Sequence, residues 1–156
     1  MKDLERLIDI ESIKNLKARY FRAIDEKNWE LLRAVFHDDV ELDYRGAATD
    51  AFGNNLIPDA TVSVVHGADE GVKTVSGSLV GIRSVHHGHM PEIEIISKGL
   101  ARAIWPMYDL LIFPPESAIS TLVGHGQYFE EYLKVAGDWK IRKLRLKRFH
   151  VNVTKK

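Results

Sequence analysis

The chain of 156 residues has the length and composition of one globular domain. Hydrophobic residues make up 45% of it and charged residues 28%, and 22 Lys and Arg balance 22 Asp and Glu, so the formal net charge is zero. A dedicated nucleic-acid or membrane-surface binder usually has a basic excess, which is missing here. The absence of cysteine excludes disulfides, zinc–thiolate sites and cysteine nucleophiles.

The start of the chain is amphipathic and interrupted by charges, which is not typical of a secretory signal peptide. No apolar run approaches the roughly 18 residues that a membrane-spanning helix needs. We therefore expect a single cytoplasmic domain, residues 1–156, with neither a nucleic-acid nor a membrane partner.

The first third of the chain is predicted to contain two helices and a strand. Apolar residues recur at spacings of three and four over residues 3–27, as on one face of a helix. Asn28 is a favourable N-cap for a second, shorter helix. The apolar face of that helix comprises Trp29, Leu32, Val35 and Phe36. Residues 39–45 alternate as a strand does, and residues 46–66 are predicted to form a long loop with one short β-like piece, TVSVV.

The rest of the chain is predicted to be mainly β-structure. Residues 67–83 have helical spacing that glycines weaken. Four strand-like runs follow, separated by turn signals. They span residues 85–97, 100–113, 119–135 and 138–153. Helices at the start and long antiparallel strands at the end indicate an α+β fold, in which helices pack on the concave face of one curved sheet.

Three histidines lie close together in the segment VHHGHMPEIEI, residues 85–95. In a strand, His86 and His87 point to opposite faces, so one strand cannot direct all three imidazoles at one metal ion. The segment therefore gives little support to a metal site, and we expect His87 to be a surface or capping residue.

Two charged residues interrupt apolar patterns in the predicted strands. Asp109 lies in AIWPMYDLLIF, a run typical of a strand buried on both faces, where a carboxylate must be paired, hydrogen-bonded or neutralised. Such an acid either marks a functional site or only satisfies nearby donors. Arg148 extends the apolar phase of the last strand, so it meets a buried acid or an anionic ligand, or else reaches solvent at the sheet edge.

Tyr20 and Asp25 lie near the end of the first predicted helix. At about 100° per residue they are about 140° apart, so both can border one cavity only near its rim. Taken alone, Tyr20 is equally compatible with an ordinary core aromatic and Asp25 with a solvated charge, although an acid at this end opposes the helix dipole.

Several segments together resemble the SnoaL-like branch of the NTF2-like superfamily, and within it the group that includes scytalone dehydratase and the bile acid 7α-dehydratases. These segments are IESIKNLKARYFRAIDEKNWELLRAVFHDDVELDY, VHHGHMPEIEI, AIWPMYD and WKIRKLRLKRF. The resemblance extends from about Asp9 to Val151 and is weak between Gly46 and Gly71. It implies a cone-shaped α+β barrel around a largely apolar pocket, with no metal or organic cofactor.

The resemblance also implies which residues form the site. The catalytic tyrosine, helix aspartate, histidine and strand aspartate of the family fall on Tyr20, Asp25, His86 and Asp109. Substrate-binding positions fall on Arg148, Trp105, Met107, Phe36 and His89. His87 stands where the family often has an apolar residue. This difference and the loop 46–70 could reshape the mouth of the pocket.

The activity implied by the resemblance is elimination of water, or an isomerisation through the same enolate, on a steroid-like, polyketide-derived or aromatic carbonyl compound. His86 is the expected base, with Asp109 hydrogen-bonded to it, and Tyr20, aided by Asp25, is the expected proton donor. A homo-oligomer, dimer or trimer, is also implied. The alternatives are a non-catalytic protein that binds hydrophobic ligands and an accessory subunit of an oxygenase.

Overall fold

The computed structural model describes residues 3–47, 49–50, 52–55 and 63–156. In these ranges the elements occur in the order α1 Asp3–Asp25, α2 Trp29–Val35, β1 Phe36–Asp43, a 3-10 turn Arg45–Ala47, β2 Val64–His66, α3 Ala68–Ser78, β3 Arg83–Gly88, β4 Glu92–Ser97, β5 Leu100–Ile112, β6 Ile119–Val135 and β7 Asp138–Lys155. The first two residues of TVSVV lie outside the described residues. No helix in the described ranges is long and apolar enough to cross a membrane.

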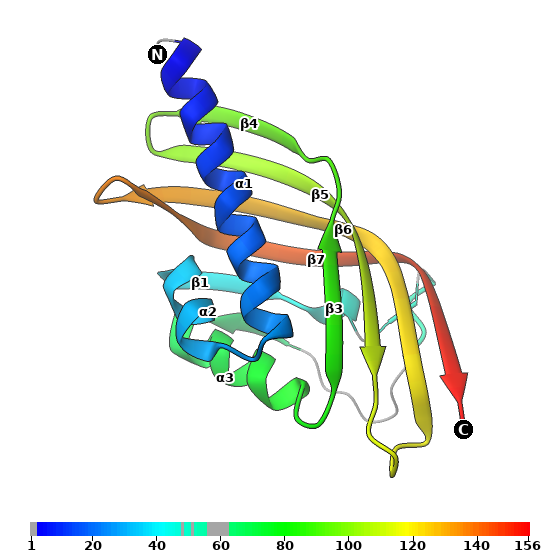
Figure 1. The fold of residues 1–156 in the computed structure, drawn as a ribbon. Helices are drawn as coiled ribbons and strands as arrows, with labels where there is room; N and C mark the ends of the chain where they lie inside the picture. Colours follow the sequence, from blue (N-terminus) through cyan, green and yellow to red (C-terminus); the bar gives the residue numbers. More distant parts are fainter. Residues whose placement is uncertain (1–2, 48, 51, 56–62) are drawn as a thin grey trace.

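The strands form one curved seven-stranded sheet in the order β2-β1-β7-β6-β5-β3, with β4 also paired to β5. Neighbouring strands are antiparallel, except that β1 and β7 are parallel. The long helix α1 lies across the concave face of the sheet, and α2 and α3 lie near β1 at its lower end (Figure 1). The predicted α+β cone is therefore confirmed.

The run predicted as one strand over residues 85–97 is two strands. β3 pairs with the second half of β5 and β4 with the first half, so the two follow one another along the same edge. The break falls at His89–Met90–Pro91, where Pro91 has no N–H to donate to the ladder. The backbone N–H of His89 still donates to the Pro106 carbonyl at 2.8 Å, which keeps the edge continuous.

Strand β5 is buried on one face only, whereas its apolar run predicted burial on both. Its inward residues, such as Trp105 and Met107, are almost fully buried beneath α1, but Ile104, Tyr108 and Leu110 on the outer face are only half-buried. The reason is that α1 covers the concave side of the sheet (Figure 1).

The end of α1 is set by a backbone motif around Lys27. Lys27 adopts a left-handed φ of 58°, its N–H donates to the Ile24 carbonyl, and the N–H of Asn28 donates to the Ala23 carbonyl at 2.8 Å. Asn28 then caps α2, because its side chain accepts from the N–H of Leu31 at 3.0 Å. The predicted N-cap is confirmed, and this tight exit places the last turn of α1 beside β3.

The centre of α1 is joined to β6 by a buried ion pair. Both side chains, Lys17 and Glu130, have no solvent exposure, and the ammonium donates directly to the carboxylate. Lys17 was not singled out from the sequence, although it lies on the same helical stripe as Ile13 and Tyr20. Its aliphatic stem fills the helix–sheet interface, and its charge must be matched because water cannot reach it.

We expect the two charges of this pair to be needed together. Lys17→Met leaves a buried carboxylate without its cation and should lower the free energy of unfolding by about 3–5 kcal/mol. The double variant Lys17→Met/Glu130→Gln removes both charges and should regain most of that loss. Urea denaturation of the wild type and both variants measures the difference, and a double variant no more stable than the single one would contradict the pairing.

Candidate active site

The side chain of His86 is anchored to the end of α1 by Asp25. Its Nδ1 lies 2.7 Å from Asp25 Oδ1, and its backbone N–H donates to Asp25 Oδ2 at 2.8 Å. Ser84 Oγ donates to Asp25 Oδ1 at 3.0 Å and itself accepts from Lys27 Nζ at 2.8 Å. An Asp25 carboxylate that accepts from Nδ1–H leaves the lone pair of Nε2 free to take a proton.

These contacts favour the ionised form of Asp25. Burial raises its pKa, but the hydrogen bonds from His86 and Ser84 and the charge of His86 act in the opposite direction and outweigh burial, so the pKa lies below its usual value. Asp25 is therefore a carboxylate at neutral pH, suited to holding the imidazole and stabilising an imidazolium.

Asp109 is paired with Arg148. The guanidinium donates to both carboxylate oxygens, at 2.7 Å from Nη1 and 2.6 Å from Nη2, and both side chains are almost completely buried. Arg148 Nε also donates to the Ala47 carbonyl at 3.3 Å. Of the two possibilities left open by the sequence, Arg148 thus meets a buried acid and does not reach solvent.

Gly124 leaves the space for this pair. It lies directly opposite Asp109 on β6, and a Cβ at this position would overlap the Arg148 guanidinium and crowd the Asp109 carboxylate. The glycine therefore serves the close approach of two charged side chains from β5 and β7.

The expected hydrogen bond between His86 and Asp109 is not formed. The two residues are directly opposite on β3 and β5, but His86 Nε2 lies 4.0 Å from Asp109 Oδ2, beyond hydrogen-bond distance. The carboxylate that orients the imidazole is Asp25, because Asp109 has both oxygens engaged by Arg148. Asp25 therefore takes the position beside the imidazole that we expected for Asp109, and Asp109 binds Arg148 instead.

Tyr20 is buried on the inner face of α1 and paired with another tyrosine. Its hydroxyl lies 3.0 Å from that of Tyr44, which follows β1, and either can donate to the other. Burial is the largest cause that raises the pKa of Tyr20 well above its usual value, so the phenol keeps its proton. Tyr44 was missed in the sequence, where it is one aromatic residue at the end of a predicted strand.

The other expected substrate-binding residues fall into two groups. Trp105, Met107 and Phe36 are buried in the core on the concave side, where Trp105 Nε1 donates to the Tyr132 hydroxyl at 2.8 Å. His89 is exposed in the β3–β4 connection and does not join this buried group. His87 is also exposed, on the outer face, where its ring contacts Tyr108. Among the described residues, no three His, Asp or Glu side chains converge on a point that could hold a metal ion.

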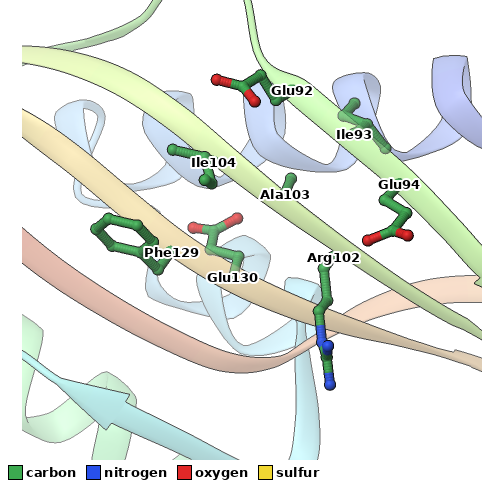
Figure 2. Close-up of a pocket in the computed structure, with 8 residues that line it drawn as sticks. All are labelled: Glu92, Ile93, Glu94, Arg102, Ala103, Ile104, Phe129 and Glu130. Atoms are coloured by element: carbon green, nitrogen blue, oxygen red, sulfur yellow. The ribbon is translucent and has the colours of Figure 1, made fainter.

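The groove drawn in Figure 2 lies apart from the expected site residues. It has a volume of about 530 Å³ and lies between β4, β5 and β6 (Figure 2). Its lining residues are Glu92, Ile93, Glu94, Arg102, Ala103, Ile104, Phe129 and Glu130, none of which is an expected site residue. A second depression, of about 760 Å³, reaches Asp25 and Ser84 between the ends of α1 and α3 and the start of β3. Asp25 thus borders the second depression, and none of the expected site residues borders the groove.

The fold and these residues define a small α+β cone with a partly buried imidazole–carboxylate pair. The chain belongs to the SnoaL-like domain family, whose model matches residues 5–145. The expected family is therefore confirmed over most of the chain.

Solved structures with the same fold carry several activities in their names. A candidate scytalone dehydratase from Novosphingobium aromaticivorans DSM 12444 superposes with a TM-score of 0.80 at 22% identity, over 97% of this chain and 91% of that one. Hexachlorocyclohexane dehydrochlorinase LinA-type3 from Novosphingobium barchaimii LL02 gives 0.75 at 20% identity, over 97% and 94%. A candidate aromatic ring hydroxylase from Novosphingobium aromaticivorans gives 0.78 at 14% identity, over 95% and 94%. At these identities the likeness shows a shared fold.

The anchoring of His86 predicts a pH-dependent contribution to stability. A carboxylate whose pKa is lowered in the folded state stabilises it above the unfolded-state pKa of about 3.9, and this stabilisation is lost as the pH falls through the lowered value. Asp25→Asn should therefore cost about 2 kcal/mol at pH 7, the size of a hydrogen bond to a charged group, and less below pH 4. Urea denaturation of the wild type and of Asp25→Asn, at pH 7 and below pH 4, measures this difference. An equal loss of stability at both pH values would contradict the prediction.

Gly124 offers a test of the pairing between Asp109 and Arg148. Gly124→Ala should displace the Arg148 guanidinium from Asp109 and lower the free energy of unfolding by about 3 kcal/mol. Gly77→Ala is the matched control, because a Cβ at Gly77 in α3 meets no atom within 4 Å and should be neutral or stabilising by up to about 1 kcal/mol. Equal stabilities of the two variants would show that the space at Gly124 is not required.

Proposed function

We propose that this protein is a lyase of the dehydratase type, with His86 as the general base on a hydrophobic carbonyl compound. The observation that carries the proposal is the anchoring of His86, whose Nδ1 is held by Asp25 while its Nε2 faces the side of Asp109. An imidazole fixed in one tautomer by a carboxylate is suited to removing a proton next to a carbonyl.

The reaction would run in two parts. His86 Nε2 takes the proton from the carbon next to the carbonyl, and the electrons of that C–H bond form an enolate. The enolate then re-forms the C=O bond and makes the C=C bond as the C–O bond to the β-hydroxyl breaks. The departing oxygen takes the proton held on His86 Nε2, so that water leaves and His86 is neutral again. Asp25 and the Asp109 carboxylate 4.0 Å away favour the transient imidazolium. An isomerisation would share the first part and return the proton to a different carbon.

The hydroxyl pair of Tyr20 and Tyr44 is the proposed source of hydrogen bonds to the oxygen that gains charge. Because Asp109 occupies both terminal nitrogens of Arg148, this arginine would act through Asp109 and not as a receptor for an anionic substrate. The buried side chains of Trp105, Met107 and Phe36 support a hydrophobic substrate.

The names of the structural neighbours are compatible with this reaction type. A dehydratase removes water and a dehydrochlorinase removes hydrogen chloride, and both are eliminations across neighbouring carbon atoms. The family and these neighbours together support a lyase- or isomerase-type enzyme broadly, and the particular substrate is part of the proposal.

A non-catalytic ligand-binding protein is the second candidate. Its supporting observation is that Asp109 and Arg148 satisfy each other completely, as a purely structural pair would. An accessory subunit of an oxygenase shares this property and has a structural neighbour named as a candidate ring hydroxylase. Either protein would bind ligand equally well when His86 is replaced.

Self-association remains a prediction, as does the cytoplasmic location. The half-buried residues Ile104, Tyr108 and Leu110 on the outer face of β5 support a dimer or trimer, because a second copy packed there would bury the face that α1 does not cover.

The proposed base is tested by comparing two neighbouring histidines. With a panel of β-hydroxy ketones that carry aromatic or polycyclic groups, formation of the conjugated enone is followed by ultraviolet absorption. His86→Gln should lower kcat/KM at least about 100-fold and Asp25→Asn by about tenfold or more, since the base or its orientation is lost. His87→Gln, on the outer face, should be unchanged. Activity retained in His86→Gln would overturn the assignment of the base.

A further inference from the structure

The buried ion pair of Lys17 and Glu130 lies beside the proposed proton donor and has no part in the reaction described above. Lys17 precedes Tyr20 by one helical turn on α1, and Glu130 lies two residues after Tyr128 on β6, on the same side of the strand. Burying two opposite charges does not in general stabilise a fold more than apolar residues of the same volume. The pair therefore calls for a further reason.

The positive end of the pair faces aromatic rings. The ammonium of Lys17 lies 4.0 Å from the ring centroid of Tyr20, 3.8 Å from that of Tyr128 and 4.7 Å from that of Phe21. The rings of Tyr20 and Tyr128 meet edge to face, with centroids 6.0 Å apart. A cation over the face of an aromatic ring is attracted most strongly where water is excluded, as it is here.

The negative end of the pair is held in place from the other side. The Tyr132 hydroxyl donates to the Glu130 carboxylate and accepts from Trp105 Nε1 at 2.8 Å. A carboxylate bound in this way cannot follow the ammonium if α1 shifts, so the network fixes where the cation lies against the rings.

We propose that Lys17 is a positioning residue for Tyr20: the ammonium of Lys17 makes the Tyr20 hydroxyl a stronger proton donor. The inference rests on the proposed function, in which Tyr20 donates to the oxygen that gains charge. A positive charge over the ring stabilises the negative charge that develops on the phenol oxygen and its ring as the proton is shared. Glu130 opposes this effect, but the ammonium is the member of the pair in contact with the ring.

The charge of Lys17 is itself sensitive to pH. Burial lowers its pKa and Glu130 raises it, with the result that the pKa is about 8. The titratable groups in contact with the ammonium are Tyr20 on its own helix and Glu130 and Tyr128 on β6. Because burial raises the pKa of both tyrosines well above the usual value, the rings themselves do not ionise near pH 8.

The first test needs no substrate. Protein labelled with ¹³C-tyrosine is titrated between pH 6 and about 10 by NMR, and the signals of Tyr20 and Tyr128 are assigned with Tyr20→Phe and Tyr128→Phe. We expect both signals to move in one step at about pH 8 in the wild type, and the step to be absent in Lys17→Met/Glu130→Gln.

A matched control is available on the same helix. Lys14 Nζ and Glu11 form an exposed pair at 2.6 Å, so Lys14→Met/Glu11→Gln removes the same two charges away from the rings and should keep the step. Tyr20 signals at pH 7 that are the same in the wild type and in Lys17→Met/Glu130→Gln, or a step that persists when Lys17 is replaced, would overturn the proposal whatever the protein's activity.

The second test uses turnover of the β-hydroxy ketones. The wild-type kcat should fall above pH 8 with the same midpoint as the NMR step. Lys17→Met/Glu130→Gln should be about tenfold slower at pH 7, flat through pH 8, and little changed in KM. The Lys14 control should match the wild type. An unchanged kcat would overturn the positioning role and leave His86 as the base. If the wild type turned over none of the compounds, the proposed function and the contribution of Lys17 to turnover would both fail, and the ring signals alone would decide whether Lys17 acts on Tyr20.

Discussion

The arrangement of this molecule depends on how α1 is held against a sheet that buries charge. Three charged side chains, Asp9, Lys17 and Asp25, follow one another at intervals of eight residues, which is about 12 Å along the helix. Asp9 binds side chains at the ends of β6 and β7, Lys17 binds Glu130 in β6, and Asp25 binds His86 in β3. Because a buried charge without a partner is costly, these contacts fix the position and rotation of the helix together.

The fixed position of α1 also decides which of two carboxylates, Asp25 or Asp109, binds the imidazole of His86. Asp25, at the end of α1, reaches β3 and takes the Nδ1 side of His86. Asp109, in the next strand, is opposite His86 but is held by the guanidinium from β7, which passes over Gly124. Asp25 thus holds the imidazole at Nδ1, while Asp109 lies 4.0 Å from Nε2 and makes no hydrogen bond to it.

Proteins that share the SnoaL-like cone are named for different reactions. Neighbours named for elimination of water, elimination of hydrogen chloride and ring hydroxylation share it at identities of 14–22%. The shared fold therefore does not by itself specify a reaction. In this chain the polar contacts between α1 and the sheet include the Lys17 network, and the Tyr20–Tyr44 pair joins α1 to the residue that follows β1.

The sequence by itself determined the class of fold, the cap at Asn28, and the unusual character of Asp109 and Arg148, because periodicity, capping chemistry and a charge within an apolar phase are local properties. The family resemblance added His86 and Asp25. Only the tertiary structure decided that Asp25 and not Asp109 binds the imidazole, that the histidine-rich run breaks at Pro91, and that Lys17 meets Glu130 across 113 positions. Such pairings depend on how a helix is rotated on a twisted sheet, and this rotation is set by all the buried contacts at once.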